Sequence, residues 1–188
     1  TGPIVNASVD PIFRNEIKRE YNDTAKFKVF LDDADRTGAD LQNYIRRLAI
    51  MAKLYGAIYI VVNNEAEIGA TVQDSLNKRA LPYLVHVLPS EVTHWHFDER
   101  GQMVEFGYKS SVKDAEDKTR TRYYTWSETA WTVADENMQI IRQGENPLGR
   151  LPVVQYFGRS TDPMEVLPPP EFLSVAQTNL HVYQLCSW

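Results

Sequence analysis

The residues best placed to do chemistry lie in one short stretch, where His94, His96 and Asp98 alternate with Trp95 and Phe97. Alternate residues of a β-strand share a face, so two imidazoles and a carboxylate would converge while the two aromatic rings face the core. Zinc accepts both ligand types. Any half-buried strand with a polar outer face has the same alternation, and we favour that interpretation. The triplet is thus a metal candidate that we do not favour, and we expect no cofactor.

Nucleophilic catalysis finds no support in the sequence. The single cysteine, Cys186, lies in an apolar segment with no basic neighbour to lower its pKa, which predicts a buried small hydrophobic residue. The chain contains no Gly-x-Ser-x-Gly elbow, Walker loop or Gly-x-Gly-x-x-Gly motif. We therefore assign no catalytic residue and expect a protein that is not an enzyme.

Nucleic-acid binding has one candidate segment, residues 120–126, in which arginines precede Tyr123, Tyr124 and Trp126. Aromatic rings beside basic groups can stack on bases. The alternative, which we favour, is a strand that turns Tyr124 and Trp126 to the core. The chain has 20 Lys and Arg against 25 Asp and Glu, a formal net charge of −5, which argues against a broad phosphate-binding face.

Composition and length indicate one globular domain. The chain has 188 residues, of which 43% are hydrophobic, enough for a packed core. The longest apolar run, residues 57–62, is too short to span a bilayer, and one cysteine excludes an internal disulfide. Neither end carries a signal peptide, start methionine or helix cap, so we expect a segment cut from a longer cytoplasmic-type protein.

The N-terminal part predicts helices followed by a buried strand. Residues 10–21 have helical spacing, with Pro11 in the first turn. Residues 41–55 carry a longer apolar stripe, which Gly56 is placed to end, and residues 57–62 form a strand that is apolar on both faces. We expect this helix, glycine and strand to nucleate the core.

From residue 81 to 157 the hydrophobic period changes to two. The pattern predicts six or seven strands in an antiparallel meander. The fold class is therefore α+β, with the N-terminal helices packed on a meander or a small, partly open barrel.

A proline run, residues 168–170, precedes a final apolar helix that we expect to begin at Glu171. We divide the chain into a domain at residues 1–160 and a stiffened linker with the start of a helix at residues 161–188. The predicted core or interaction residues are Leu41, Tyr44, Leu48, Tyr55, Gly56, Trp95, Trp126, Phe172, Leu180 and Tyr183.

Four stretches, in this order and spacing, resemble the N-terminal wing region of tailed-bacteriophage portal proteins, including those of prophages. They are residues 35–41 (DRTGADL) with 54–62 (LYGAIYIVV), 81–83 (LPY) with 88–95 (LPSEVTHW), 146–154 (NPLGRLPVV), and 170–188. The last is similar to the helix that leads toward the portal stem. The resemblance covers the chain from about residue 33 onward.

The resemblance implies a structural subunit of a ring, usually dodecameric, at the capsid vertex, through which DNA is packaged and later ejected. The implied partners are other portal subunits, the terminase motor, head-completion and capsid or scaffold proteins, and double-stranded DNA in transit. No membrane or small-molecule substrate is implied. The expected location is the virion, and the cytoplasm of the bacterial host before assembly.

The stem and clip of the family would lie beyond Trp188, so we expect this chain alone to be a monomer or a weak oligomer. Two alternatives stay open. One is a phage adaptor module that binds protein through a sheet edge and the apolar terminal helix. The other is a metal-dependent enzyme centred on His94, His96 and Asp98.

Overall fold

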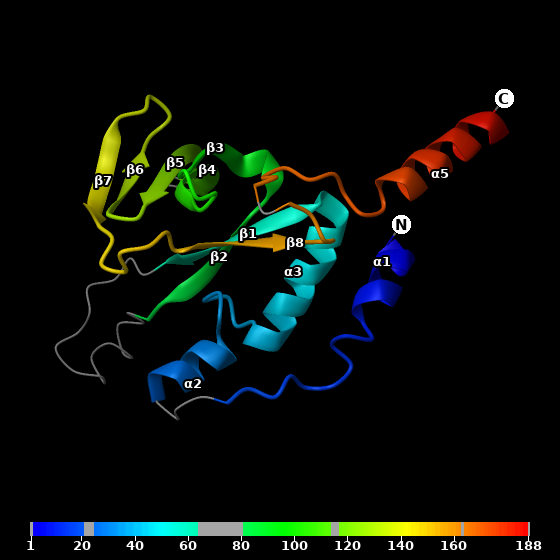
Figure 1. Ribbon diagram of the computed structural model, residues 1–188, viewed down its shortest axis with the longest axis horizontal. Coiled ribbons are helices and arrows are strands. Elements are labelled where there is room, and N and C mark those ends of the chain that lie inside the picture. Colours follow the sequence, from blue (N-terminus) through cyan, green and yellow to red (C-terminus); the bar gives the residue numbers. More distant parts are fainter. Residues whose placement is uncertain (1, 21–24, 64–80, 114–116, 163, 188) are drawn as a thin grey trace.

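The structure, a computed structural model, describes residues 2–20, 25–63, 81–113, 117–162 and 164–187. It is α+β, with three helices, α1 (Gly2–Val9), α2 (Ala25–Asp32) and α3 (Leu41–Tyr55), before the first strand and α5 (Leu173–Cys186) after the last. Between them lie two antiparallel sheets, and a short 3₁₀ turn, η1 (Pro89–Glu91), joins one sheet to the other. Figure 1 shows α2 and α3 below the small sheet, the larger sheet above it, and α5 projecting to one side.

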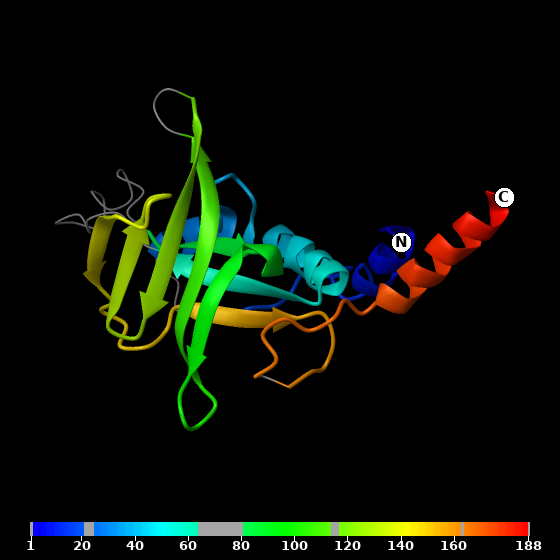
Figure 2. The same cartoon turned by 90° about the horizontal axis from the view of Figure 1, so that it is seen from above.

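The three-stranded sheet has the order β2-β1-β8, formed by β2 (Tyr83–Val87), β1 (Ala57–Asn63) and β8 (Val153–Phe157). The five-stranded sheet is a meander of β3 (Val92–Phe97), β4 (Met103–Lys113), β5 (Thr119–Ser127), β6 (Ala130–Ala134) and β7 (Ile140–Glu145). Seen from above, the long β4–β5 hairpin crosses β1 and β8 at a steep angle (Figure 2). The expected meander is confirmed for five strands, but the last strand pairs with β1, and the described strands close no barrel.

Helix α3 and β1 form the predicted local unit. Asp40 caps α3 by accepting a hydrogen bond from the Asn43 backbone N–H (2.9 Å), and Gly56 ends it with φ +90°. Tyr44 and Leu48 are fully buried, as predicted. Tyr55 is wrong as a core residue: it is 46% exposed, because the last turn of α3 extends past the edge of the cluster that the helix covers.

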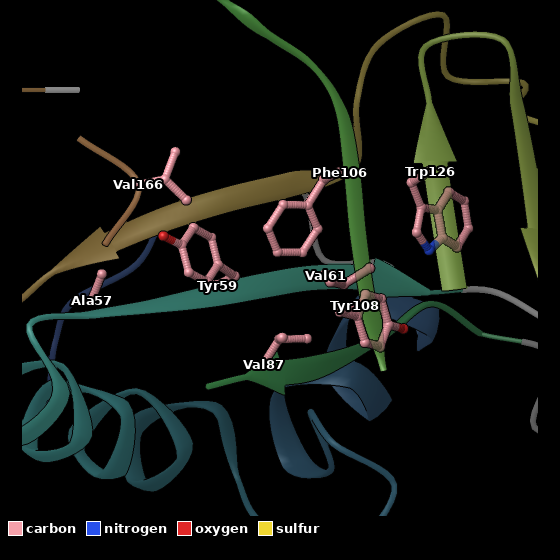
Figure 3. Close-up of a cluster of buried hydrophobic side chains, with 8 residues drawn as sticks. All are labelled: Ala57, Tyr59, Val61, Val87, Phe106, Tyr108, Trp126 and Val166. Carbon is pink, nitrogen blue, oxygen red and sulfur yellow. The ribbon is translucent and has the colours of Figure 1, made fainter. Parts of the chain in front are cut away.

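Strand β1 is covered on both faces, which explains its run of apolar residues. Ile58 packs with Tyr44, Leu48 and Ala52 of α3. On the other face Tyr59 meets Phe106 of β4, with ring centroids 4.9 Å apart. Figure 3 shows this second cluster, in which side chains of both sheets interleave. Trp126 belongs to it and is 8% exposed, as predicted.

The first helix differs from the prediction. It spans Gly2–Val9 rather than residues 10–21, of which residue 21 lies outside the described part. Pro11 follows the helix instead of opening one, because a proline disfavours the α conformation at the preceding residue and donates no backbone hydrogen bond. Val5 and Val9 are fully buried, so α1 still packs on the body.

Trp95 is also wrong as a core residue, since 40% of it is exposed. The pairing of β3 with β4 shifts register between Val92 and His94 and again between His96 and Phe97. Trp95 lies between the shifts and pairs with the fully buried Phe106, so it shares the face of Phe106, but β3 is an edge strand, which leaves the ring partly uncovered.

Candidate functional site

The residues of the metal candidate do not form a joint site. His94 turns to Glu105 of the neighbouring strand, with 3.2 Å between Nε2 and Oε1. Asp98 instead holds the β3–β4 turn, where its Oδ1 accepts hydrogen bonds from the backbone N–H groups of Arg100 (2.9 Å) and Gln102 (2.8 Å). In the described parts of the chain no three His, Cys, Asp or Glu residues are grouped so as to hold a metal ion. The convergence of His94, His96 and Asp98 expected from alternation is therefore wrong, because the register shift lies between His96 and Asp98.

A second polar group lies under α3, half-buried between the helix and β2. The Tyr44 hydroxyl is 3.5 Å from Nδ1 of His86, and Arg47 pairs with Asp35 (2.9 Å). Burial lowers the pKa of His86, and Arg47 lowers it further, while Glu91 and Asp35 act in the opposite direction. Burial raises the pKa of Asp35, but hydrogen bonds from Thr37 and Arg47 outweigh burial and hold it below its ordinary value. The pair of Arg47 and Asp35 connects the loop before α3 to the helix, and the contact of Tyr44 with His86 connects the helix to β2.

The segment at residues 120–126 runs along β5 as the favoured interpretation expected. Tyr124 stacks on Tyr108 with 4.9 Å between ring centroids and 7° between ring planes, and Trp126 lies 6.0 Å from Trp131. Tyr124 and Trp126 pack with the core cluster. They are thus occupied by packing and are not presented for base stacking.

Helix α5 exposes apolar side chains to solvent. It extends away from the body in both views (Figures 1 and 2). None of its residues is buried, and its sequence, LSVAQTNLHVYQLC, has no Asp, Glu, Lys or Arg. Six large apolar residues on it are exposed: Leu173, Val175, Leu180, Val182, Tyr183 and Leu185. An apolar helix without charges is typical of an element covered by protein.

The residues predicted as core or interaction residues on this helix are exposed or half-buried. Leu180 is 55% exposed and Tyr183 is 73% exposed, so neither is a core residue of this chain. Phe172 is half-buried at the start of α5, which begins two residues later than expected. Cys186, predicted to be buried, is exposed, because α5 packs on nothing in the described chain.

The segment before α5 is attached to the body at several points, and we call residues 164–172 the strap. Val166 is 3% exposed and belongs to the core cluster, where it lies beside Tyr59 (Figure 3). Pro168 packs on Gly56 so closely that a Cβ at Gly56 would collide with its carbonyl oxygen. The strap therefore lies on the junction between α3 and β1.

Lys53 fastens the end of the strap. Its Nζ forms an ion pair with the Glu171 carboxylate and donates to the Gly158 carbonyl (3.4 Å), at the end of β8. The same Nζ lies 5.9 Å from the centre of the Phe172 ring. Glu171 and Phe172 immediately precede α5, so these contacts fix the direction in which the helix leaves the body. Sequence analysis missed this role of Lys53, because only the fold brings residues 53 and 171 together.

No family model matches the chain, and no curated protein matches it. In the described residues no helix has the length and apolarity that crossing a membrane requires. The exposed helix and the strap that aims it are therefore the features on which a function can be argued.

Proposed function

We propose that the protein is a structural subunit of a phage portal ring at the capsid vertex, where it forms part of the conduit for DNA packaging and ejection. The observation that carries the proposal is α5, an uncharged helix with exposed apolar side chains that the strap directs away from the body. Such a helix suits a subunit that is completed by its neighbours in an assembly.

The order of elements supports the same proposal. The α3, Gly56 and β1 unit, the sheets that follow and the proline-stiffened strap lie in the order of the portal wing motifs named above. The net charge of −5 suits a wall past which DNA slides, because a strongly basic wall would bind the phosphates. Terminase, capsid or scaffold proteins, head-completion proteins and further portal subunits are the partners that this role implies.

The direct test is electron microscopy and light scattering of the natural gene product that carries these residues. We expect rings with an axial channel, in which this domain forms part of the outer region. We also expect the gene to continue beyond codon 188 into long helices and a segment that returns to this domain. A natural product that is monomeric, and whose gene encodes no such continuation, would refute the portal proposal.

A phage adaptor module is the second candidate, and one observation favours it. Strand β7 is an edge of the five-stranded sheet, and Ile140 and Ile141 on it are 60% and 45% exposed. A sheet edge with apolar side chains can accept a strand from a partner. Replacing Ile141 by Lys should abolish partner binding by an adaptor, whereas a portal ring held by α5 should still assemble.

A further inference from the structure

Five of the six exposed large apolar residues of α5, together with Cys186, fall into two separate stripes. Leu173, Leu180 and Tyr183 have the spacing i, i+7, i+10, and we call them stripe one. Val175, Val182 and Cys186 have the spacing i, i+7, i+11, and we call them stripe two. At 3.6 residues per turn the centres of the two stripes are roughly 120° apart around the helix. Ser174 and His181 lie on the remaining side, and Leu185 lies outside both stripes.

Two stripes require two different covering surfaces. A two-fold dimer uses one patch that contacts its own copy, which would cover one stripe and leave the other in water. In a closed ring each copy contacts two neighbours through two different patches. The two stripes of α5 therefore match the second arrangement.

The body of the same chain does not cover the helix, and the strap explains why. The ion pair between Lys53 and Glu171 and the packing of Pro168 on Gly56 hold the base of α5 in a direction that leads away from both sheets. Within the described residues nothing buries the helix, and a helix without charged residues offers nothing to a charged partner.

We infer that stripe one of α5 packs against stripe two of α5 from a second copy of this chain, with the helices parallel, so that each copy contacts one neighbour on either side. The inference rests on the proposed function, because neighbouring copies in a ring of about twelve differ by a rotation of roughly 30°, so their α5 helices run nearly parallel. It names the contact between subunits at the residue level.

The size of the contact predicts its strength. A 14-residue helix is about 21 Å long and about 10 Å wide, so it presents a strip of roughly 200 Å² to one neighbour. Even doubled for surface relief, this is about half of the ~800 Å² per partner that stable complexes bury. A single contact between α5 helices should therefore be weak, and only copies with both stripes engaged gain the full area.

The test uses two variants that each damage one stripe, Leu180→Asp and Val182→Asp, in the whole 188-residue chain. His181→Asp is the matched control, because it adds the same charge to the same helix between the stripes. Sedimentation equilibrium over a wide concentration range measures association. Circular dichroism and chemical denaturation verify that each variant keeps its fold, which we expect because α5 has no buried residue.

We expect the unmodified chain and the control to associate as concentration rises, and each stripe variant alone to remain monomeric. A mixture of the two stripe variants should recover dimers and nothing larger, because the intact stripe one of Val182→Asp can pack on the intact stripe two of Leu180→Asp. Recovery in the mixture is the result that a two-fold contact cannot produce.

Three outcomes would overturn the inference. If Val182→Asp alone associates like the unmodified chain, stripe one packs on itself. If both variants associate normally, α5 is not the contact. If the unmodified chain stays monomeric at every concentration, copies of α5 do not bind one another. A natural gene product that still forms rings in any of these cases would preserve the portal proposal while the inference fails.

The single cysteine tests the direction of the helices. Parallel neighbours place their Cys186 sulfurs roughly 10–15 Å apart, given helix axes 8–10 Å apart, whereas antiparallel neighbours separate them by about the helix length of 21 Å. A bismaleimide with a linker matched to the shorter distance should yield a covalent dimer at concentrations where the chain associates. Cys186→Ser is the control. Association without a covalent dimer would refute the parallel arrangement.

Discussion

Strand β1 and helix α5 are both largely apolar, but they have opposite environments. Ile58, Tyr59 and Val61 of β1 are fully buried, while Leu180 and Tyr183 of α5 are mostly exposed. Apolar composition indicates that a segment has to be covered but does not say by what. For β1 the cover comes from α3 and β4 of the same chain, and for α5 none of the described residues supplies it.

The ends of the helices repeat the contrast. Helix α3 is fixed by the Asp40 side chain at its start and by Gly56 at its end. Helix α5 begins at Leu173, its N-cap Phe172 makes no side-chain cap hydrogen bond, and its last turn has no basic residue. Helix α5 is held instead by the strap before it, which orients the helix relative to the body but adds no cap that would stabilise the helix itself.

The largest expected difference between the two regions concerns truncation of a side chain. Phe106→Ala, at the contact with Tyr59, should lower the free energy of unfolding by about 3–5 kcal/mol. Leu180→Ala should change it by less than about 0.5 kcal/mol, because no native contact is lost. Urea denaturation at low protein concentration measures both. Equal losses would mean that α5 packs on the folded monomer and would remove the contrast.

A smaller effect is expected where the strap crosses the body. Gly56→Ala introduces a Cβ into the carbonyl of Pro168 at a φ of +90°. Gly38→Ala is the matched control, since Gly38 has a φ of +91° and open space around it. Both variants place a side chain at a positive φ, which destabilises each of them. The free energy of unfolding of Gly56→Ala should be lower than that of the control by about 1–3 kcal/mol, the usual effect of overpacking. If the two variants have the same denaturation midpoint, the strap can move away from the added Cβ without loss of stability.

The smallest expected effect is a dependence of stability on pH through His86. Its pKa in the folded protein lies below its ordinary value, because burial and Arg47 disfavour the charged ring. The unfolded chain therefore binds a proton more readily, and stability falls as pH decreases through about 6.5, the ordinary histidine value.

The matched variant is His86→Gln, which cannot titrate. Its free energy of unfolding should lose the decrease below about pH 6.5, while the unmodified chain keeps it. Thermal denaturation across a pH series measures this. If both chains show the same decrease, another group causes it, and the burial of His86 under α3 has no effect on stability.

Local sequence patterns predicted much of the fold, but they did not predict contacts between residues far apart in the sequence. The stripe of α3, Gly56 and the buried strand were readable because each depends on neighbours in sequence. The pairing of Tyr59 with Gln155 was not, because a strand pattern does not say which sheet the strand joins. The exposure of Trp95 was not readable either, because a strand pattern does not say that β3 lies at the edge of its sheet.

The candidate site was predicted in part. The apolar character of α5 was evident, and its residues Leu180 and Tyr183 were singled out. The exposure of these residues was not predictable, since apolar helices are usually buried within their own domain. The role of Lys53 depends on a contact between residues 53 and 171, which no local pattern reveals.

The attachment of the strap also determines how the protein would bear mechanical load. A pull along α5 passes through Glu171 to Lys53 on α3, and through Pro168 and Val166 to Gly56 and the core cluster. Strand β1, next in sequence to Gly56, is paired with a strand on each side and covered on both faces. Tension on the exposed helix is thus shared between these contacts and the backbone that joins the strap to β8, and β8 is itself paired with β1.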